Sequence, residues 1–211
     1  MKICFIADFF ADEINGGGEL NNEELINILA STHDVTKVKS MDFLPEHADE
    51  DTNYVVCNFL GLREESKSVL KNYIIYEHDH KYVKSRNPAL YKNFVVPQSE
   101  IINYHFYKNA AAVLCQSAFH RAIIENNLKL DNIVSVGGNI WPIETLEKIR
   151  QFSKNHKKDA CAVLNSNIAH KNTAGAVKYC QTSGQDYGLV ASPNYEEFLQ
   201  SLSHFSKFVS A

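Results

Sequence analysis

The chain has 211 residues, a length that suits one domain or one and a half. It is 45% hydrophobic and 22% charged, which is the composition of an ordinary soluble globular protein, and no apolar run is long enough to span a bilayer. Its net charge of −4 gives no overall signal for nucleic-acid binding.

The cysteines indicate a cellular compartment. They are odd in number, lack any Cys-x-x-Cys pair, and mostly lie inside apolar runs. The N-terminus leads straight into an apolar strand rather than into the charged start and long apolar run of a signal peptide. We therefore expect reduced, buried thiols in a cytoplasmic protein. The cysteines are Cys4, Cys57, Cys115, Cys161 and Cys180.

The first thirty residues predict a strand, a glycine-rich turn and a helix. An apolar run covers residues 2–7, a loop covers residues 8–15, and three glycines follow. The helix over residues 19–30 has one apolar face, because its apolar residues are spaced three and four apart. The residues of that face are Leu25, Ile28 and Leu29.

Gly16, Gly17 and Gly18 predict a phosphate site. Three glycines let the backbone adopt φ > 0 and approach a ligand closely. The helix that follows directs its unpaired N–H groups and the positive end of its dipole at the turn. The alternative is a flexible connection between a strand and a helix, and these residues alone do not separate the two.

Short apolar strands alternate with helices up to residue 141. This alternation predicts βαβ units, an α/β fold and a mostly parallel sheet. Such a sheet binds ligands at the carboxyl ends of its strands, so we expect residues 16–18, 77–80 and 137–139 on one rim. The predicted strands are residues 35–38, 54–59, 73–76, 111–115 and 133–136, and the predicted helices are residues 64–70, 99–108 and a helix that Ser117 caps.

A second series of strands and helices follows a predicted linker. Pro142 suits the start of a helix over residues 142–158, which ends in a cluster of cations. We therefore expect a first domain over residues 1–141, this linker helix, and a second domain over residues 159–211. The second domain has too few strands for a complete doubly wound domain: strands at residues 160–164, 187–190 and 205–209, with helices at residues 172–181 and 194–204.

The glycines match a dinucleotide-binding fingerprint poorly. That fingerprint places Gly-x-Gly-x-x-Gly directly after the strand and an acidic residue at the end of the second strand. Here residues 8–15 intervene, Asn21 replaces the third glycine, and residues 37–39 end the second strand with two lysines. A Walker A loop is excluded because no Gly-Lys-Ser/Thr occurs. A dinucleotide-dependent oxidoreductase is kept as one alternative.

Two histidines and two carboxylates follow the strand at residues 73–76. They have the chemistry of metal ligands. In an extended segment, however, the histidines share one face while the carboxylates point away, and no third ligand is identifiable, so we expect no metal. A histidine that lines a polar site is the second interpretation, and an ordinary polar loop is the third. The residues are Glu77, His78, Asp79 and His80.

A local positive patch follows on this acidic protein. Residues 81–99 contain four cations and no acid, with aromatic residues interleaved. Beside a cleft at the strand ends, such a patch suits an anionic acceptor or peripheral contact with a membrane surface, whereas most such runs are solvated surface. The cations are Lys81, Lys84, Arg86 and Lys92.

The loop at residues 165–172 connects a strand to a helix. It places Lys171 at the helix N-terminus, where the helix dipole disfavours a cation. A bound phosphate would resolve that conflict, and an exposed lysine at a cost of about a few tenths of a kcal/mol is the alternative. No Gly-x-Ser-x-Gly elbow is present for nucleophilic catalysis.

Together these segments resemble the GT-B glycosyltransferases, in the retaining group that includes relatives of sucrose and glycogen synthases and many bacterial glycan transferases. Their order and spacing cover nearly the whole chain, beginning with the turn at residues 16–18. The further matches are residues 76–79 with the family's His-Asp, residues 110–121 with its strand followed by serine and arginine, residues 136–141 with the turn that closes the first domain, and residues 162–172 with the opening strand and phosphate loop of the second.

The resemblance implies two Rossmann-like domains, the second incomplete, and transfer of a sugar from a UDP- or GDP-sugar to a glycan or other acceptor. It implies no metal and no cofactor, because backbone N–H groups and cations stabilise the leaving nucleotide. His78 and Asp79 are the implied catalytic residues, with His78 on the transferred sugar. The residues implied to bind the nucleotide-sugar are Gly16, Gly17, Gly18, Asn167 and Lys171; those implied on the acceptor side are Lys81, Lys84 and Arg86.

Two departures from the family pattern matter. The arginine that usually precedes the lysine is missing, because residues 165–167 read Asn-Ser-Asn. The family's Glu-x7-Glu segment lies beyond a strand like residues 205–209, so we expect a fragment of a longer enzyme or a truncated relative. The alternative from a different class is a non-catalytic module that binds a nucleotide or a partner.

Overall fold

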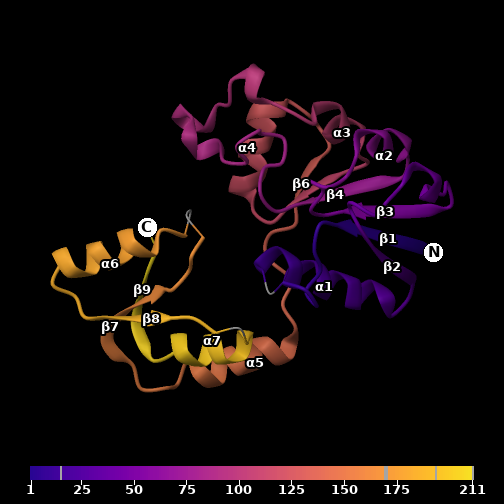
Figure 1. Ribbon diagram of the computed structural model, residues 1–211. Helices are drawn as coiled ribbons and strands as arrows, with labels where there is room; N and C mark the ends of the chain where they lie inside the picture. Colours follow the sequence, from indigo (N-terminus) through magenta and orange to yellow (C-terminus); the bar gives the residue numbers. More distant parts are fainter. Residues whose placement is uncertain (15, 169–170, 193, 211) are drawn as a thin grey trace. The chain divides into compact units, whose positions relative to one another are not determined.

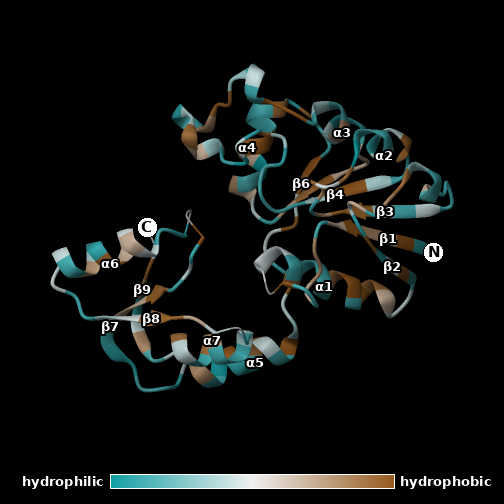
Figure 2. Cartoon of the chain, viewed as in Figure 1, coloured by the Kyte–Doolittle hydropathy of each residue, from teal (hydrophilic) through white to brown (hydrophobic). Residues whose placement is uncertain are grey.

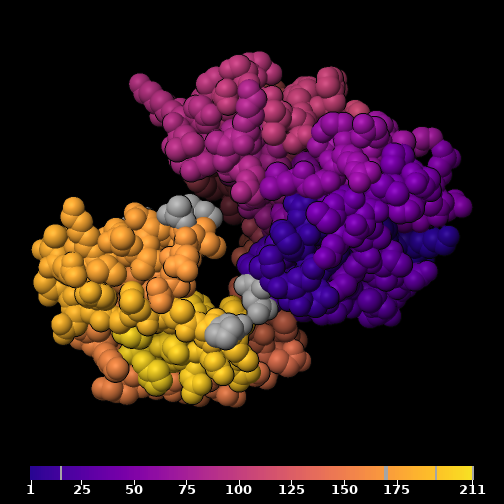
Figure 3. Space-filling view, viewed as in Figure 1, coloured from indigo at the N-terminus to yellow at the C-terminus, as the bar shows by residue number. Residues whose placement is uncertain are grey.

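The structure, a computed structural model, forms two compact units: unit 1 (Met1–Ile140) and unit 2 (Trp141–Ala211). Figure 1 traces the elements of each unit, and Figure 3 shows the same chain with side chains, unit 2 in orange to yellow. No helix of the described part has the length and apolarity needed to cross a bilayer. The described residues are 1–14, 16–168, 171–192 and 194–210.

Unit 1 is built on a six-stranded parallel sheet with the order β2-β1-β3-β4-β5-β6. The predicted α/β class and parallel sheet are therefore confirmed for this unit, and the sheet is consistent with a Rossmann-like fold. The strand order reverses at β1, and α/β sheets bind ligands at the carboxyl ends beside such a reversal. The strands are β1 (Lys2–Ala7), β2 (Asp34–Lys39), β3 (Thr52–Val56), β4 (Tyr73–Glu77), β5 (Val113–Cys115) and β6 (Ile133–Ser135).

Both faces of this sheet are buried. Successive side chains of a strand point to opposite faces, and in β1 the cluster that contains Cys4 and Ile6 is separate from the one that contains Ile3, Phe5 and Ala7. Burial on both faces explains why the strands are apolar runs rather than alternating patterns. Figure 2 shows the hydrophobic strands between helices with polar outer surfaces.

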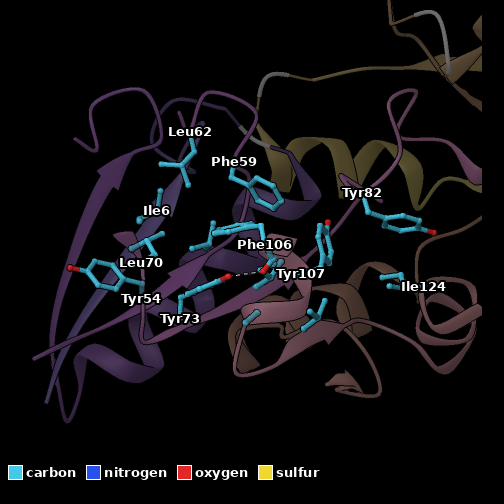
Figure 4. Packing of buried hydrophobic residues seen from close by; sticks show 14 of the residues in the cluster. Ile6, Tyr54, Phe59, Leu62, Leu70, Tyr73, Tyr82, Phe106, Tyr107 and Ile124 are labelled. Atoms are coloured by element: carbon cyan, nitrogen blue, oxygen red, sulfur yellow. Dashed lines mark hydrogen bonds between the residues drawn. The ribbon is translucent and has the colours of Figure 1, made fainter. Parts of the chain in front are cut away.

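Helices cover the two faces. Ile26 of α1 belongs to one cluster, and residues of α3 and α4 belong to the other. In the second cluster the rings of Tyr73 and Phe106 stack with centroids 4.7 Å apart, and the Tyr73 hydroxyl donates to the Phe106 carbonyl at 2.6 Å (Figure 4). The helices are α1 (Gly17–Ala30), α2 (Glu64–Val69), α3 (Tyr104–Asn109) and α4 (Ala118–Leu128), with 3-10 turns η1 (Pro45–His47), η2 (Pro88–Leu90), η3 (Lys92–Phe94) and η4 (Gln98–Glu100).

The predicted helix over residues 99–108 is wrong in its first half. A 3-10 turn and α3 replace it, because Asn103 between them is left-handed, with φ of 56°. Its side chain donates to the Lys81 carbonyl at 2.9 Å, which fixes the break. The Ser117 cap is confirmed: its hydroxyl accepts from the backbone N–H of His120 at 3.1 Å.

Unit 2 has a parallel three-stranded sheet with the order β8-β7-β9. Its core is small and centres on Cys161, Val163, Ala176 and Cys180. The predicted linker helix is shorter than expected: α5 ends at Phe152, six residues before β7 begins. The elements are α5 (Ile143–Phe152), β7 (Lys158–Leu164), α6 (Thr173–Thr182), β8 (Tyr187–Val190), α7 (Tyr195–Leu202) and β9 (Phe205–Val209).

The five cysteines are all buried and unpaired, as their positions in apolar runs predict. Burial raises the pKa of the Cys4 thiol and that of the Cys57 thiol. A raised pKa keeps the reactive thiolate scarce, so these two thiols act as small apolar side chains of the core.

Candidate functional site

Polar side chains gather at the carboxyl ends of the strands of unit 1. Asn58 follows β3, His78 follows β4 and Gln116 follows β5. Parallel strands end at the same edge of a sheet, and hydrogen bonds join these residues to each other or to the start of α1. We call this group the rim site: Glu19, Asn22, Asn58, His78 and Gln116.

The glycines begin α1 rather than forming a turn before it. Gly16 is the N-cap residue with φ of −91°, and Gly17 and Gly18 lie in the first helical turn. The expectation that the glycines supply φ > 0 is therefore wrong. A Cβ on Gly16 would meet the Glu19 carboxylate and one on Gly18 would sit 3.4 Å from Cγ of His78, while one at Gly17 would meet open space. Asn15, the end of the predicted loop, lies outside the described residues.

His78 is bonded at both ring nitrogens. Its Nε2 lies 2.7 Å from Oδ1 of Asn22, and its Nδ1 lies 2.7 Å from Nε2 of Gln116. These partners assign the tautomer, since Nε2–H donates to the Asn22 oxygen and Nδ1 accepts from the Gln116 amide. Burial, with the charge of Lys81, lowers the pKa of His78 to about 4. The imidazole is therefore neutral near pH 7 and fixed in orientation.

Two consecutive asparagines of α1 are buried beside His78. Asn22 is fully buried, and its Nδ2 has no hydrogen-bond partner among the described residues. Asn21 accepts from the hydroxyl of Tyr76 and donates to the carbonyl of Ile140 at 3.2 Å. These amides occupy the inner face of the first turns of α1, so its apolar contact with the sheet begins further on, at Leu25 and Ile26. Of the predicted apolar face, Leu25 and Leu29 pack against this core, whereas Ile28 is 49% exposed.

Glu19 brings a negative charge to the start of α1. One carboxylate oxygen accepts from Nδ2 of Asn58 at 2.8 Å, and the other lies where a Cβ on Gly16 would be. A carboxylate in the first turn is favoured by the helix dipole. It also repels a second anion at the same helix terminus, so a phosphate can approach these amides only if the Glu19 side chain moves away.

Asp8 fixes the loop that follows β3. Its two carboxylate oxygens accept from the backbone N–H groups of Leu60 and Gly61, each at 2.9 Å. The loop after β1 and the loop after β3 are thereby joined at the point where the strand order reverses. This bond pair positions Asn58, and through it Glu19.

His78 and His80 do not share a face, contrary to the expectation for an extended segment. β4 ends at Glu77, and His80 is left-handed with φ of 57°. His78 contacts α1, whereas the ring of His80 lies 4.5 Å, centroid to centroid, from that of His120 in α4. The segment therefore sends its two imidazoles to different helices.

Glu77 points into the core, where a polar network surrounds it. It accepts from the hydroxyl of Tyr107, from Nζ of Lys81 at 3.3 Å and from the backbone N–H of Asp79 at 2.9 Å. Burial alone raises the pKa of Glu77, but Lys81 and the Tyr107 hydroxyl outweigh it and lower the pKa to about 2. Glu77 is therefore an ionised carboxylate with 0% exposure.

Lys81 does not belong to the predicted positive patch. It is 1% exposed and pairs with Glu77 and Asp79, so it belongs to the core and not to the surface. Burial lowers the pKa of Lys81, but the two carboxylates outweigh that effect and the net pKa is raised. The lysine is charged and has no free surface to offer an acceptor.

Two of the remaining patch residues are exposed but paired. Lys84 donates to the carbonyl of Ser99 at 2.7 Å and lies 3.6 Å from the Glu100 carboxylate. Arg86 pairs with Asp79 at 2.9 Å. Acids that lie just outside residues 81–99 therefore pair with three of the four cations, Lys81, Lys84 and Arg86. The acceptor roles of these cations and the catalytic role of Asp79 stay predictions.

The loop after β7 carries the second predicted phosphate group. Thr173 ties it together by donating to the Leu164 carbonyl at 2.7 Å and accepting from the Ser166 N–H at 3.1 Å. Lys171 lines a cavity of about 380 Å³ with Leu164 and Phe208. Asn167 is exposed on the same loop. Ala169 and His170, which the resemblance includes, lie outside the described residues.

No protein-family model matches this chain, and a search of curated proteins found no match. Within the described ranges, no three side chains of histidine, cysteine, aspartate or glutamate converge as metal ligands. What the rim site can do therefore follows from its own groups. A neutral imidazole, an unused amide N–H and a carboxylate recognise a polyhydroxyl ligand by hydrogen bonds.

Proposed function

We propose that this protein is a GT-B type glycosyltransferase that takes a sugar from a UDP- or GDP-sugar. The observation that supports this most is the neutral His78, held between Asn22 and Gln116 at the rim of a parallel sheet. An imidazole with a pKa of about 4 is a weak base near pH 7. Its Nδ1 suits accepting a hydrogen bond from a sugar hydroxyl, in place of the Gln116 amide, better than abstracting a proton.

Asn22 completes this proposed sugar contact. Its buried Nδ2 lacks an acceptor among the described residues, and an unmade buried hydrogen bond costs about 1–3 kcal/mol. A hydroxyl oxygen of the ligand would accept from it. The same hydroxyl group can donate to the Asn22 oxygen, which has a second lone pair, or to Nδ1 of His78 in place of the Gln116 amide, since a hydroxyl both donates and accepts.

The amides at the start of α1 are the phosphate-binding groups assigned in unit 1, and Lys171 is the one assigned in unit 2. The helix terminus attracts an anion once Glu19 turns away, and in unit 2 the lysine precedes α6, whose cap residue Asn172 accepts from the Gly175 N–H at 3.1 Å. These groups would stabilise the charge that develops on the leaving nucleotide. The proposal includes the assignment of unit 2 as part of a GT-B nucleotide-binding domain.

Release of UDP or GDP tests the proposal. The 211-residue chain is incubated with a panel of UDP- and GDP-sugars, with water or simple glycosides as acceptors, and nucleotide release is followed. We expect release with one donor, reduced by His78→Ala and unchanged by His105→Ala, a variant of an exposed histidine in α3. Release that is equal in wild type and His78→Ala would contradict the assignment.

A non-catalytic binding module is the second candidate, and Glu19 favours it. A carboxylate at the start of α1 repels the negative charge that develops on a leaving diphosphate, so it disfavours turnover more than binding. Such a module would bind a donor or nucleotide without turnover. Binding in the absence of any release, over the whole donor panel, would select this candidate.

A further inference from the structure

His80 and His120 form a pair outside the rim site. Their rings lie 4.5 Å apart between centroids at an interplanar angle of 63°. His80 follows β4, and His120 lies in the first turn of α4, held there by the Ser117 cap. Two separate elements therefore bring two imidazoles together.

Each imidazole has a buried nitrogen without a partner. Among the residues that the structure describes, neither Nδ1 of His80 nor Nε2 of His120 has a hydrogen-bond partner, and both atoms are buried. Each such atom costs about 1–3 kcal/mol. The left-handed backbone of His80, with φ of 57°, adds a further cost. Unfavourable features concentrated at one pair indicate a site that a ligand completes.

The charges around the pair favour a metal cation over protons. Burial lowers the pKa of both histidines, that of His80 to about 4, and neutral imidazole is the form that binds metals. The charges that act on the pair are the carboxylates of Glu77 and Asp79, which favour a cation, and Lys81, which opposes it. Two protons would place two charges on adjacent rings, whereas a single metal ion uses both lone pairs.

We propose that Nδ1 of His80 and Nε2 of His120 bind one divalent transition-metal ion of the class that prefers imidazole. Zn²⁺, Ni²⁺ and Cu²⁺ belong to that class. Because both nitrogens are buried, the pair must open for the ion to enter and for water to fill the other coordination positions, so the ion is exchangeable rather than a fixed structural metal. This site lies beyond the proposed sugar transfer, for which no metal is required.

Calorimetric titration with NiCl₂ and ZnCl₂ tests the site. The full chain is first freed of metal with a chelator, and we expect it to bind one ion. His80→Asn and His120→Gln should each weaken binding by at least about tenfold, since loss of outer-shell groups alone costs that much. The matched control is His105→Asn, which changes an exposed histidine of the same unit. Binding as tight in the two variants as in wild type would overturn the proposal.

Two further measurements keep the test independent of folding defects. Asparagine tolerates the left-handed backbone at position 80, and far-ultraviolet circular dichroism checks that each variant is folded. In wild type alone, nitrogen-15 spectra of the imidazoles should show Zn²⁺ shifting His80 and His120 while His33 stays unchanged. Shifts confined to other histidines, or no heat and no shifts, would refute the site.

Discussion

His78 and His80 stand two residues apart after the same strand, yet their surroundings differ. His78 has partners at both ring nitrogens, from α1 and from the residue after β5. His80 has a buried nitrogen without a partner in the described part of the chain and a left-handed backbone beside His120. The comparison teaches that one short segment carries an imidazole whose ring nitrogens are both bonded within the chain and another whose buried nitrogen only a ligand would satisfy.

Removal of Glu77 should break both sites at once and have the largest effect. Glu77→Ala removes one of the two carboxylates that pair with the buried Lys81 and the acceptor of the Tyr107 hydroxyl, which costs about 3–5 kcal/mol in free energy of unfolding. Urea unfolding measures it. The control is Lys84→Ala, an exposed pair with Glu100, for which less than about 1 kcal/mol is expected. Equal effects of the two variants would contradict the role given to the buried network.

Acid should weaken the same network. In the folded protein the pKa of Glu77 is lowered from 4.5 to about 2. The contribution of its charge to the free energy of unfolding is therefore present above pH 4.5 and is lost as pH falls toward 2. That contribution is on the order of 3 kcal/mol. In Glu77→Gln, the fall in unfolding free energy between pH 4.5 and 2 should be shallower than in wild type. Parallel curves for the two proteins would rule out this carboxylate as the cause.

Substitution of Gly18 should disturb His78 and leave the pair of His80 and His120 unchanged. Gly18→Val places methyl groups against the His78 ring, where even a Cβ would be 3.4 Å from Cγ. We expect a loss of about 1–3 kcal/mol and altered imidazole resonances for His78 but not for His120. Gly17→Val, whose Cβ meets open space, is the control. A disturbed His120 with an undisturbed His78 would contradict the arrangement.

The smallest expected effect is a gain in affinity for the donor. Glu19→Gln removes the carboxylate from the start of α1 and so should strengthen donor binding by about two- to fivefold. Its hydrogen bond with Asn58 is retained by the amide oxygen, so the fold of the loop is preserved. Weaker donor binding in this variant would place the phosphates away from α1.

The strands were predictable because continuous apolar runs buried on both faces leave a local signal. The hydrogen-bond partners of His78 in the rim site were not predictable. Asn22 and Gln116 lie 56 and 38 residues from His78 in sequence, and nothing local announces either contact. Lys81 was misplaced for a related reason: a run of cations indicates surface, while its partner Glu77 lies before the run and is buried.

Calorimetric titration of UDP- and GDP-sugars into wild type and His78→Ala tests the central claim most directly. The account predicts heat with one nucleotide class in wild type and in His105→Ala, and about five- to thirtyfold weaker binding in His78→Ala, which loses a hydrogen bond to the ligand worth about 1–2 kcal/mol. No heat with any donor, or the same affinity in wild type and His78→Ala, would contradict it.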